Sequence, residues 1–267
     1  MSKKRREIPI FDFPIIETHC HLDYLKDKEL QETLDVSFKH GIEKIITISV
    51  SPNNLDTVID LSTKHENIYC TQGIHPHEAR LWNQQVRQQI LENLSFEKVV
   101  AVGEIGLDYY YNKSPREIQI EAFKEQLEIA IEKDLPVVIH TRDADEDTIE
   151  ILSDMAPRLK KKGVIHSFTS SIELARVALD LGFHLGFNGI ITFKTAQNVR
   201  DVLEICPIER VLLETDAPFL TPVPYRGKEN APYYLPFIAE FVAQTKDIEL
   251  ETVLKSCYQS SKSLFSI

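Results

Sequence analysis

Eight short, β-rich apolar runs alternate with stretches of helical periodicity along almost the whole chain. The runs lie at 13–18, 43–50, 68–73, 98–103, 135–140, 163–168, 183–188 and 210–215. Several are almost continuously apolar, as in Val99-Val100-Ala101-Val102, and strands buried on both faces of a parallel sheet have this composition. The repeated strand–helix unit predicts a parallel sheet that is covered by helices.

Some of the stretches between the runs carry helix boundary signals. Ser114-Pro115-Arg116-Glu117 would place serine at an N-cap, proline at N1 and glutamate at N3 of a helix. Gly182 follows a periodic apolar stripe and predicts a helix end. Ser51-Pro52 predicts a further helix start by the same reasoning as Ser114-Pro115.

The fold class predicted from this alternation is α/β, as a single-domain TIM-type (β/α)8 barrel. The 267 residues suit such a barrel, which takes about 250, and no linker-like segment divides them. We expect residues 11–267 to form the barrel and residues 1–10, with the basic run 3–6, to form a flexible tail. A doubly wound open sheet is the alternative, but no G-x-G-x-x-G motif follows the first run.

Charge and cysteine content restrict the possible functions. A net charge of −11 argues against a broad basic surface that coats duplex DNA, although one nucleic-acid end could still enter a local pocket. The four cysteines show no C-x-x-C spacing and no disulfide framework, which favours a reducing compartment. Without a secretory signal or a membrane-length apolar run, we expect a cytoplasmic protein without membrane association. No obligate protein partner is indicated.

Histidine and carboxylate side chains recur where the predicted strands end. Residues i and i+2 of a strand point to the same side, so His19 and His21 can face one metal ion. One such pair is usually incidental, but loops after all strands of a barrel converge on one mouth. The agreement of several strand ends therefore predicts one site, built from His19, His21, His75, His77, Glu104, Asp108, His140, His166, Glu214 and Asp216.

Four imidazoles and two carboxylates suit two divalent ions about 3.5–4 Å apart, bridged by a carboxylate and a solvent oxygen. Mixed nitrogen and oxygen ligands fit zinc, magnesium or manganese, and the sequence does not decide among them. Such ions lower the pKa of coordinated water and stabilise charge that develops on a phosphoryl or acyl oxygen. A two-metal hydrolase is the predicted class of protein.

These segments resemble the TatD family of metal-dependent deoxyribonucleases. The resembling motifs are E-T-H-C-H-L-D (17–23), G-I-H-P-H (73–77), G-E-I-G-L-D-Y-Y (103–110), P-V-V-I-H-T-R-D-A (136–144), G-V-I-H-S-F (163–168), L-L-E-T-D-A-P-F-L-T-P (212–222) and P-V-P-Y-R-G-K (222–228). The resemblance covers essentially the whole chain. It implies a TIM barrel of the metallo-dependent hydrolase superfamily that cleaves phosphodiester bonds, usually of DNA.

The resemblance also implies roles for individual residues. His19 and His21 would bind the first metal ion, which Asp216 would complete, while Glu104 would bridge both ions. The second ion would be held by His140 and His166. Asp216 would also handle the proton of the attacking water, so Asp216 and Glu104 are the predicted catalytic residues.

Four residues near the mouth are predicted to contact the substrate phosphate, and these are His75, His77, Arg142 and Arg226. A structural pairing of Arg142 with Asp143 or Asp145 is an equal alternative. Tyr109 and Tyr110 would stack on a base or, more often for such a loop, pack as a lid.

Three positions depart from the family pattern. Glu17 stands where the family usually has aspartate, and Ser167 and Ser170 stand where it often has cysteine and glycine. None is an expected metal ligand, so the departures affect the predicted shape of the substrate mouth and leave the metal site intact.

Two other functions remain open from sequence. An amidohydrolase or lactonase acting on a small amide or ester would use the same barrel and metal pair. Related phosphotriesterase-like enzymes usually bridge their metals with a modified lysine, whereas Glu104 holds that place here and favours the nuclease family. A barrel that keeps metal only for stability is the non-enzymatic alternative. If the protein is a nuclease, the net charge of −11 favours an exonuclease-like enzyme that takes DNA ends or short oligonucleotides.

Overall fold

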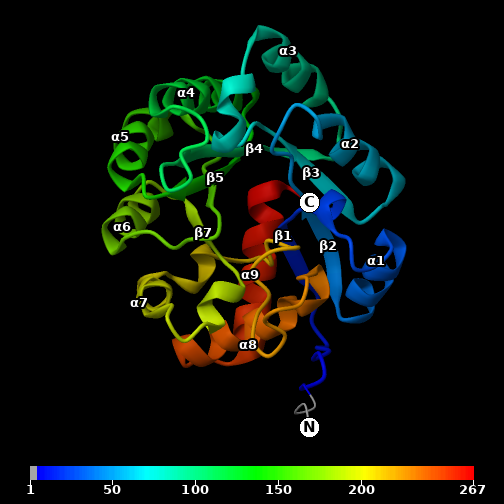
Figure 1. Ribbon diagram of the computed structural model, residues 1–267. Helices are drawn as coiled ribbons and strands as arrows, with labels where there is room; N and C mark the ends of the chain where they lie inside the picture. The colour runs from blue at the N-terminus through cyan, green and yellow to red at the C-terminus, as the bar shows by residue number, and fades with distance from the viewer. Residues whose placement is uncertain (1–4) are drawn as a thin grey trace.

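The computed structural model describes residues 5–267, and its eight parallel strands curve into a barrel (Figure 1). Each strand pairs with the next along the chain, in the order β1 to β8. The strands are β1 (Ile15–Cys20), β2 (Ile42–Thr47), β3 (Ile68–Gln72), β4 (Val99–Asp108), β5 (Val137–Arg142), β6 (Gly163–Ile165), β7 (His184–Phe187) and β8 (Val211–Leu213). The predicted α/β barrel and all eight predicted strands are confirmed.

Backbone hydrogen bonds beyond the strand ends bring β1 and β8 together. The amide of Asp216 donates to the carbonyl of His19 at 2.8 Å, and the amide of His21 donates to the carbonyl of Ala217 at 2.7 Å. The hydroxyl of Thr18 also donates to the carbonyl of Leu213 at 3.0 Å. The rim where strands end is therefore continuous across the junction, and His19 and Asp216 lie on both sides of it.

Helices surround the strands on the outside, except α9, which lies within the outline of the ring in Figure 1. They are α1 (Leu30–Lys39), α2 (Leu55–Lys64), α3 (Gln84–Asn93), α4 (Arg116–Lys133), α5 (Asp145–Met155), α6 (Ile172–Asp180), α7 (Gln197–Ile205), α8 (Leu235–Lys246) and α9 (Leu250–Phe265). Within residues 5–267 no helix is both long enough and apolar enough to cross a membrane.

The predicted helix boundaries are partly right. Gly182 follows α6 with a φ of +91°, which confirms the predicted stop. The predicted start at Ser51-Pro52 is too early, because α2 begins at Leu55 after a turn that Asn54 ties to the amides of residues 50 and 51. Ser114 precedes α4 but does not cap it; its hydroxyl donates to the carbonyl of His77 at 3.0 Å.

The barrel interior is filled by apolar side chains of the strands. Phe265 and Leu264, at the end of α9, pack against this inner cluster, and Figure 1 shows the end of α9 near the centre of the ring. The other buried residues of the cluster are Ile46, Ile48, Val100, Ala101, Val138, Val164 and Leu212. The C-terminal helix therefore forms part of the core on which the strand ends rest.

Residues 5–10 run beside α8. The guanidinium of Arg6 forms an ion pair with Glu240, with N–O distances of 2.8 and 2.5 Å. The hydroxyl of Tyr225 donates to the carbonyl of Arg6 at 3.0 Å. The predicted flexible tail also includes Lys3 and Lys4, which lie outside the described residues, and its flexibility stays a prediction.

Phe265→Ala should lower the free energy of unfolding by about 3–5 kcal/mol, because Phe265 is 2% exposed and its loss leaves a cavity in the inner cluster. Urea unfolding measures the change. Phe96→Ala, at a residue that is 50% exposed, is the matched control and should change stability by less than about 0.5 kcal/mol. Equal effects of the two substitutions would show that α9 contributes nothing to the interior.

Candidate metal centre

The carboxylate of Glu104 occupies the middle of the barrel mouth and is almost completely buried. In the pairing of β4 with β5, Gly103 lies opposite Val138 and Ile105 lies opposite Ile139, so Glu104 is the extra residue of a bulge. Its amide donates to the carbonyl of Ser49 at 2.9 Å, which holds the bulge toward β2. A bulge that redirects one side chain explains why the site centres on β4.

Three imidazoles approach one oxygen of Glu104. The Oε1 atom lies 2.8 Å from Nε2 of His166, 3.1 Å from Nδ1 of His140 and 3.3 Å from Nε2 of His75. The other oxygen, Oε2, lies 3.5 Å from Nε2 of His19. One carboxylate therefore faces imidazoles on two sides, which is the arrangement required of a ligand shared by two ions.

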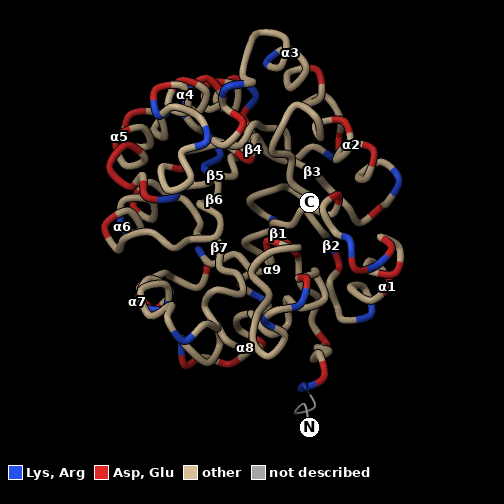
Figure 2. Tube along the Cα trace, in the orientation of Figure 1, with Lys and Arg blue, Asp and Glu red and all other residues tan. Residues whose placement is uncertain are grey.

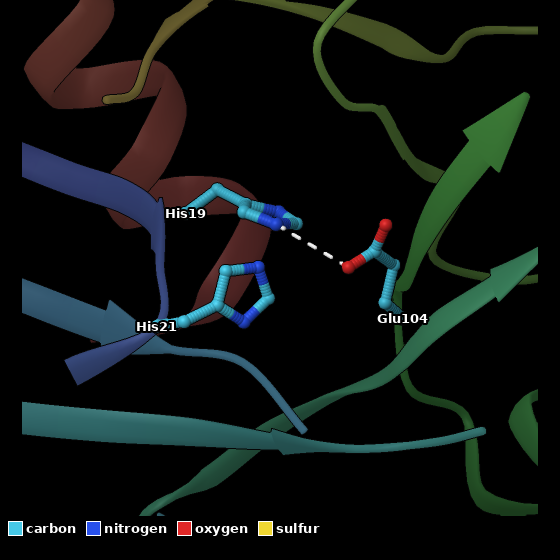
Figure 3. A group of neighbouring side chains, drawn as sticks. All are labelled: His19, His21 and Glu104. Atoms are coloured by element: carbon cyan, nitrogen blue, oxygen red, sulfur yellow. Dashed lines mark ion pairs between the residues drawn. The ribbon is translucent and has the colours of Figure 1, made fainter. Parts of the chain in front are cut away.

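His19 and His21 extend from β1 toward Glu104 on the opposite wall, as Figure 3 shows. Oδ1 of Asp216 lies 3.7 Å from Nε2 of His19 and 3.5 Å from Nε2 of His21. Asp216 has a φ of +58° just beyond β8, and the hydrogen bond that its amide donates to the carbonyl of His19 fixes this turn against β1. The sequence prediction that His19 and His21 share one side of the strand end agrees with this geometry.

Burial and neighbouring charges determine which side chains of the site are ionised. Burial would raise the pKa of Glu104, but the imidazoles of His166 and His75 outweigh burial and hold that pKa well below its usual range. Burial lowers the pKa of His19 to about 4 and that of His75 to about 3. Both rings are therefore neutral at pH 7, which is the form that binds metal ions.

His140 lies between two carboxylates. Burial would lower its pKa, but hydrogen bonds to Asp108 and Glu104 outweigh burial and raise the pKa to about 9. Its Nε2 lies 3.1 Å from Oδ2 of Asp108, and its Nδ1 faces Glu104. Because the ionised carboxylate of Asp108 only accepts, Nε2 keeps its hydrogen, and a cation bound at Nδ1 would displace the proton that the raised pKa places there.

The residues present fit divalent metal ions. Two nitrogen or oxygen ligands of one ion, at bond lengths of about 2.1 Å, lie about 3–3.4 Å apart, and the separations given above span that range. His19, His21 and Glu104 form one group of possible ligands, and His75, Glu104 and His140 form another. Both ring nitrogens of fully buried His19 lack a hydrogen-bond partner among the described residues, and a bound cation would satisfy Nε2.

Asp108 is the residue whose role the sequence reasoning left unassigned. Its Oδ2 accepts from Nε2 of both His77 and His140, at 2.9 and 3.1 Å, and its Oδ1 accepts from the amide of Tyr111 at 2.8 Å. Asp108 stands four residues after Glu104 on the same strand, an even spacing that places both on one face. That spacing was the available signal.

Two further carboxylates lie beneath the site. Oε1 of Glu17 accepts from the amides of His19 and Thr215, at 3.0 and 2.9 Å, and so joins the ends of β1 and β8. Oε1 of Glu214 accepts from the amide of Ser167 at 2.5 Å and lies 3.8 Å from Nδ1 of His166. Burial raises the pKa of Glu17 to about 8 and that of Glu214 well above its usual range. We interpret both as residues that orient the histidines.

The predicted phosphate contacts differ in position. His75 and His77 lie within the site, whereas Arg142 stacks on the ring of Tyr110 at 3.9 Å and Arg226 on Phe193 at 4.1 Å. Neither arginine contacts the residues around Glu104 among the interactions of residues 5–267. Within residues 5–267, Arg142 also forms no ion pair with Asp143 or Asp145, so the alternative pairing is not observed.

The two tyrosines predicted to stack on a base or to form a lid lie in different environments. Tyr109 is half-buried and its hydroxyl donates to Asp147, whereas Tyr110 is 57% exposed. Of the two serines that depart from the family pattern, Ser167 accepts from Nδ2 of Asn188 at 2.8 Å through its hydroxyl. Ser170 lines a recess beside the mouth.

Asp108→Asn should weaken binding of a divalent ion by about 10–100-fold, because an amide can present its NH2 group to His140 and no longer fixes the ring. Calorimetric titration of the metal-free protein with Zn²⁺ or Mn²⁺ measures the affinity. Asp180→Asn, an exposed change on α6, is the control. Unchanged affinity in Asp108→Asn would remove Asp108 from the metal centre.

Known proteins are similar in sequence to this chain over most of its length. The family described as TatD related DNase matches residues 16–266. The Bacillus subtilis metal-dependent hydrolase YabD is 37% identical over 254 residues, covering 95% of this chain and 99% of that protein. The Schizosaccharomyces pombe protein named deoxyribonuclease Tat-D is 34% identical over 263 residues, covering 85% of this chain and 84% of its own.

A solved structure agrees with the sequence comparison. The crystal structure of YjjV, a TatD homologue from Escherichia coli K12, has a TM-score of 0.89 and 30% identity, and covers 95% of this chain and 98% of that one. The resemblance found in the motifs is thereby confirmed at the level of sequence and of fold. The chain belongs to the TatD-related DNase family of metal-dependent hydrolases.

Proposed function

We propose that this protein is a deoxyribonuclease that hydrolyses phosphodiester bonds at DNA ends or in short oligonucleotides with the help of two divalent metal ions. The observation that carries this proposal is the buried carboxylate of Glu104, which imidazoles approach on both of its oxygens. The name of the fission yeast relative supports DNA as the substrate.

In this proposal His19, His21 and Asp216 hold one ion, His140 and His166 hold the other, and Glu104 bridges them. Zinc, magnesium and manganese all suit the mixed nitrogen and oxygen donors. When bound, such ions supply charge that stabilises phosphoryl oxygens and acidifies coordinated water. His75 also approaches Glu104, so it serves either as a further ligand or as a phosphate contact.

Asp216 is the proposed proton acceptor. Burial would raise its pKa, but His21 and His19 outweigh burial and lower the pKa, so the group is an ionised carboxylate at pH 7. Its position beside the imidazoles of His19 and His21, which would hold an ion and its coordinated water, supports this role. His77, Arg142 and Arg226 are proposed to contact the substrate phosphates.

The distribution of charge supports recognition of ends or short strands. Lys and Arg are dispersed over the molecule in Figure 2, and the net charge is −11. Affinity for long duplexes depends on many simultaneous phosphate contacts, which such a surface does not offer. We also propose a reducing, cytoplasmic place of action, which the four free and buried cysteines support.

Asp216→Asn should lower the rate of oligonucleotide hydrolysis by about 10²–10⁴-fold, because it removes a ligand charge and the proton acceptor together. A metal-supplemented assay with an end-labelled DNA strand measures the rate, and thermal unfolding verifies that the variant folds. Asp154→Asn on the exposed face of α5 is the control. Wild-type rates in Asp216→Asn, or faster cleavage of amide or lactone substrates by the native protein, would contradict the proposal.

A chelator should abolish hydrolysis, and adding Zn²⁺, Mg²⁺ or Mn²⁺ should restore it, because no residue of the site replaces the charge of the ions. A labelled single strand with free ends should also be degraded at least tenfold faster than a covalently closed circle of the same sequence. Gel analysis of the products measures both effects. Equal rates on the circle would refute end recognition, and activity that survives chelation would refute the metal requirement.

A further inference from the structure

A recess of about 610 Å³ opens at the rim of the barrel that carries the metal centre. Its lining includes Tyr109, which follows Asp108, and Arg142, which lies two residues after His140. It lies among the loops that follow β4, β5 and β6, and Tyr109, Arg142 and Ser170 are among the residues that line it. The same three strands lead to Glu104, His140 and His166, so the recess adjoins that side of the site. Its volume lies within the range of about 300–1,000 Å³ that is typical of sites for small molecules.

The inner surface offers groups suited to a nucleoside. The guanidinium of Arg142 stacks on Tyr110 and forms no ion pair among residues 5–267, so its N–H groups are available to a phosphate. The hydroxyls of Thr169 and Ser170 form no hydrogen bond in the described part of the chain. Nδ2 of Asn198 donates to the carbonyl of Thr169 at 3.1 Å, which leaves its amide oxygen as an acceptor. Sugar hydroxyls and base amino groups need such partners.

The rim of the recess is acidic. Four carboxylates line it at the start of α5, and Figure 2 shows acidic residues along this helix. Asp147 pairs with Arg116 at 3.5 Å, and Asp145 accepts from the amide of Ser171 at 2.9 Å. Asp143 and Glu146 are exposed, and neither carboxylate takes part in an ion pair within residues 5–267. Two carboxylates without an ion-pair partner among these residues therefore border the opening.

We propose that this recess holds the terminal nucleoside of the DNA strand and that its acidic rim rejects an end that carries a terminal phosphate. The inference rests on the proposed deoxyribonuclease function. Arg142, at the side of the recess that continues β5, would contact the phosphate between the bound nucleoside and the next one. A terminal phosphate would add a charge of about −1.5 to −2 beside Asp143 and Glu146, and like charges discriminate against a ligand effectively. The enzyme is thus specific for hydroxyl-terminated strands.

The test uses the metal-loaded protein and a short single strand in three forms: hydroxyls at both ends, a 5′-phosphate, or a 3′-phosphate. The products identify the end that is attacked. A phosphate at that end should lower kcat/KM by about threefold to tenfold, the range expected from two exposed charge contacts. A phosphate at the other end should have little effect, because that end lies outside the recess.

The double variant Asp143→Asn/Glu146→Gln should narrow this difference to within twofold. Asparagine tolerates the φ of +51° at position 143, so the backbone keeps its conformation. Glu66→Gln/Glu97→Gln is the matched control, because it removes the same charge from exposed residues that precede β3 and β4 at the opposite end of the barrel. The control should keep the full discrimination between the two kinds of end.

Ser170→Trp tests occupancy of the recess independently of charge. The added ring would fill the space, so kcat/KM for the hydroxyl-terminated strand should fall at least fivefold relative to kcat/KM for bis(p-nitrophenyl) phosphate. This ratio distinguishes an effect on binding in the recess from an effect on the metal centre, because a small diester has no terminal nucleoside. A parallel loss of both activities would show that the recess does not bind the nucleoside.

The outcomes separate this inference from the function on which it rests. If the native protein degrades DNA, but phosphorylated and hydroxyl ends react equally and Ser170→Trp leaves the ratio unchanged, the recess inference is overturned and the deoxyribonuclease function stands. If no DNA strand is hydrolysed under any metal condition, the function itself fails and the inference fails with it.

Discussion

The structure depends on one electrostatic constraint, which is that the carboxylate of Glu104 is ionised in the interior of a barrel. Burial of an unpaired charge is costly, so the charge must be met by polar or cationic partners. Imidazoles from β1, β5 and the segment after β6 approach this carboxylate, so its partners come from the ends of three separate strands. The closed ring of strands, supported from inside by Phe265 of α9, is what brings these ends within a few ångströms.

A second set of carboxylates orients the histidines instead of facing the centre of the mouth. Asp108 fixes His140 and His77 from the β4 side, Glu17 ties β1 to the end of β8, and Glu214 lies beneath His166. Such partners determine which ring nitrogen faces the ion and how firmly the ring is held. Glu104, Asp108 and Asp216, whose pKa values are lowered at this centre, account for part of the negative charge of the chain.

Sequence patterns predicted the strands because they are largely apolar, and predicted the residues around Glu104 because β1, β3, β4, β5, β6 and β8 carry or lead into a side chain of ligand type. They did not predict the contact roles of Ser114 or Asp108, because both depend on partners from another loop: Ser114 binds the carbonyl of His77, and Asp108 meets His140 across two strands. The stacking of Arg142 on Tyr110 was hidden for the same reason. Periodicity describes a residue's face and burial, whereas loop conformation decides which side chains meet.

The most direct test of the account is an anomalous difference map from crystals of this protein grown with Zn²⁺ or Mn²⁺. The account predicts two peaks on either side of the Glu104 carboxylate, one near His19, His21 and Asp216 and the other near His140 and His166. A map without peaks at the barrel mouth, or with ions that do not contact Glu104, would contradict it.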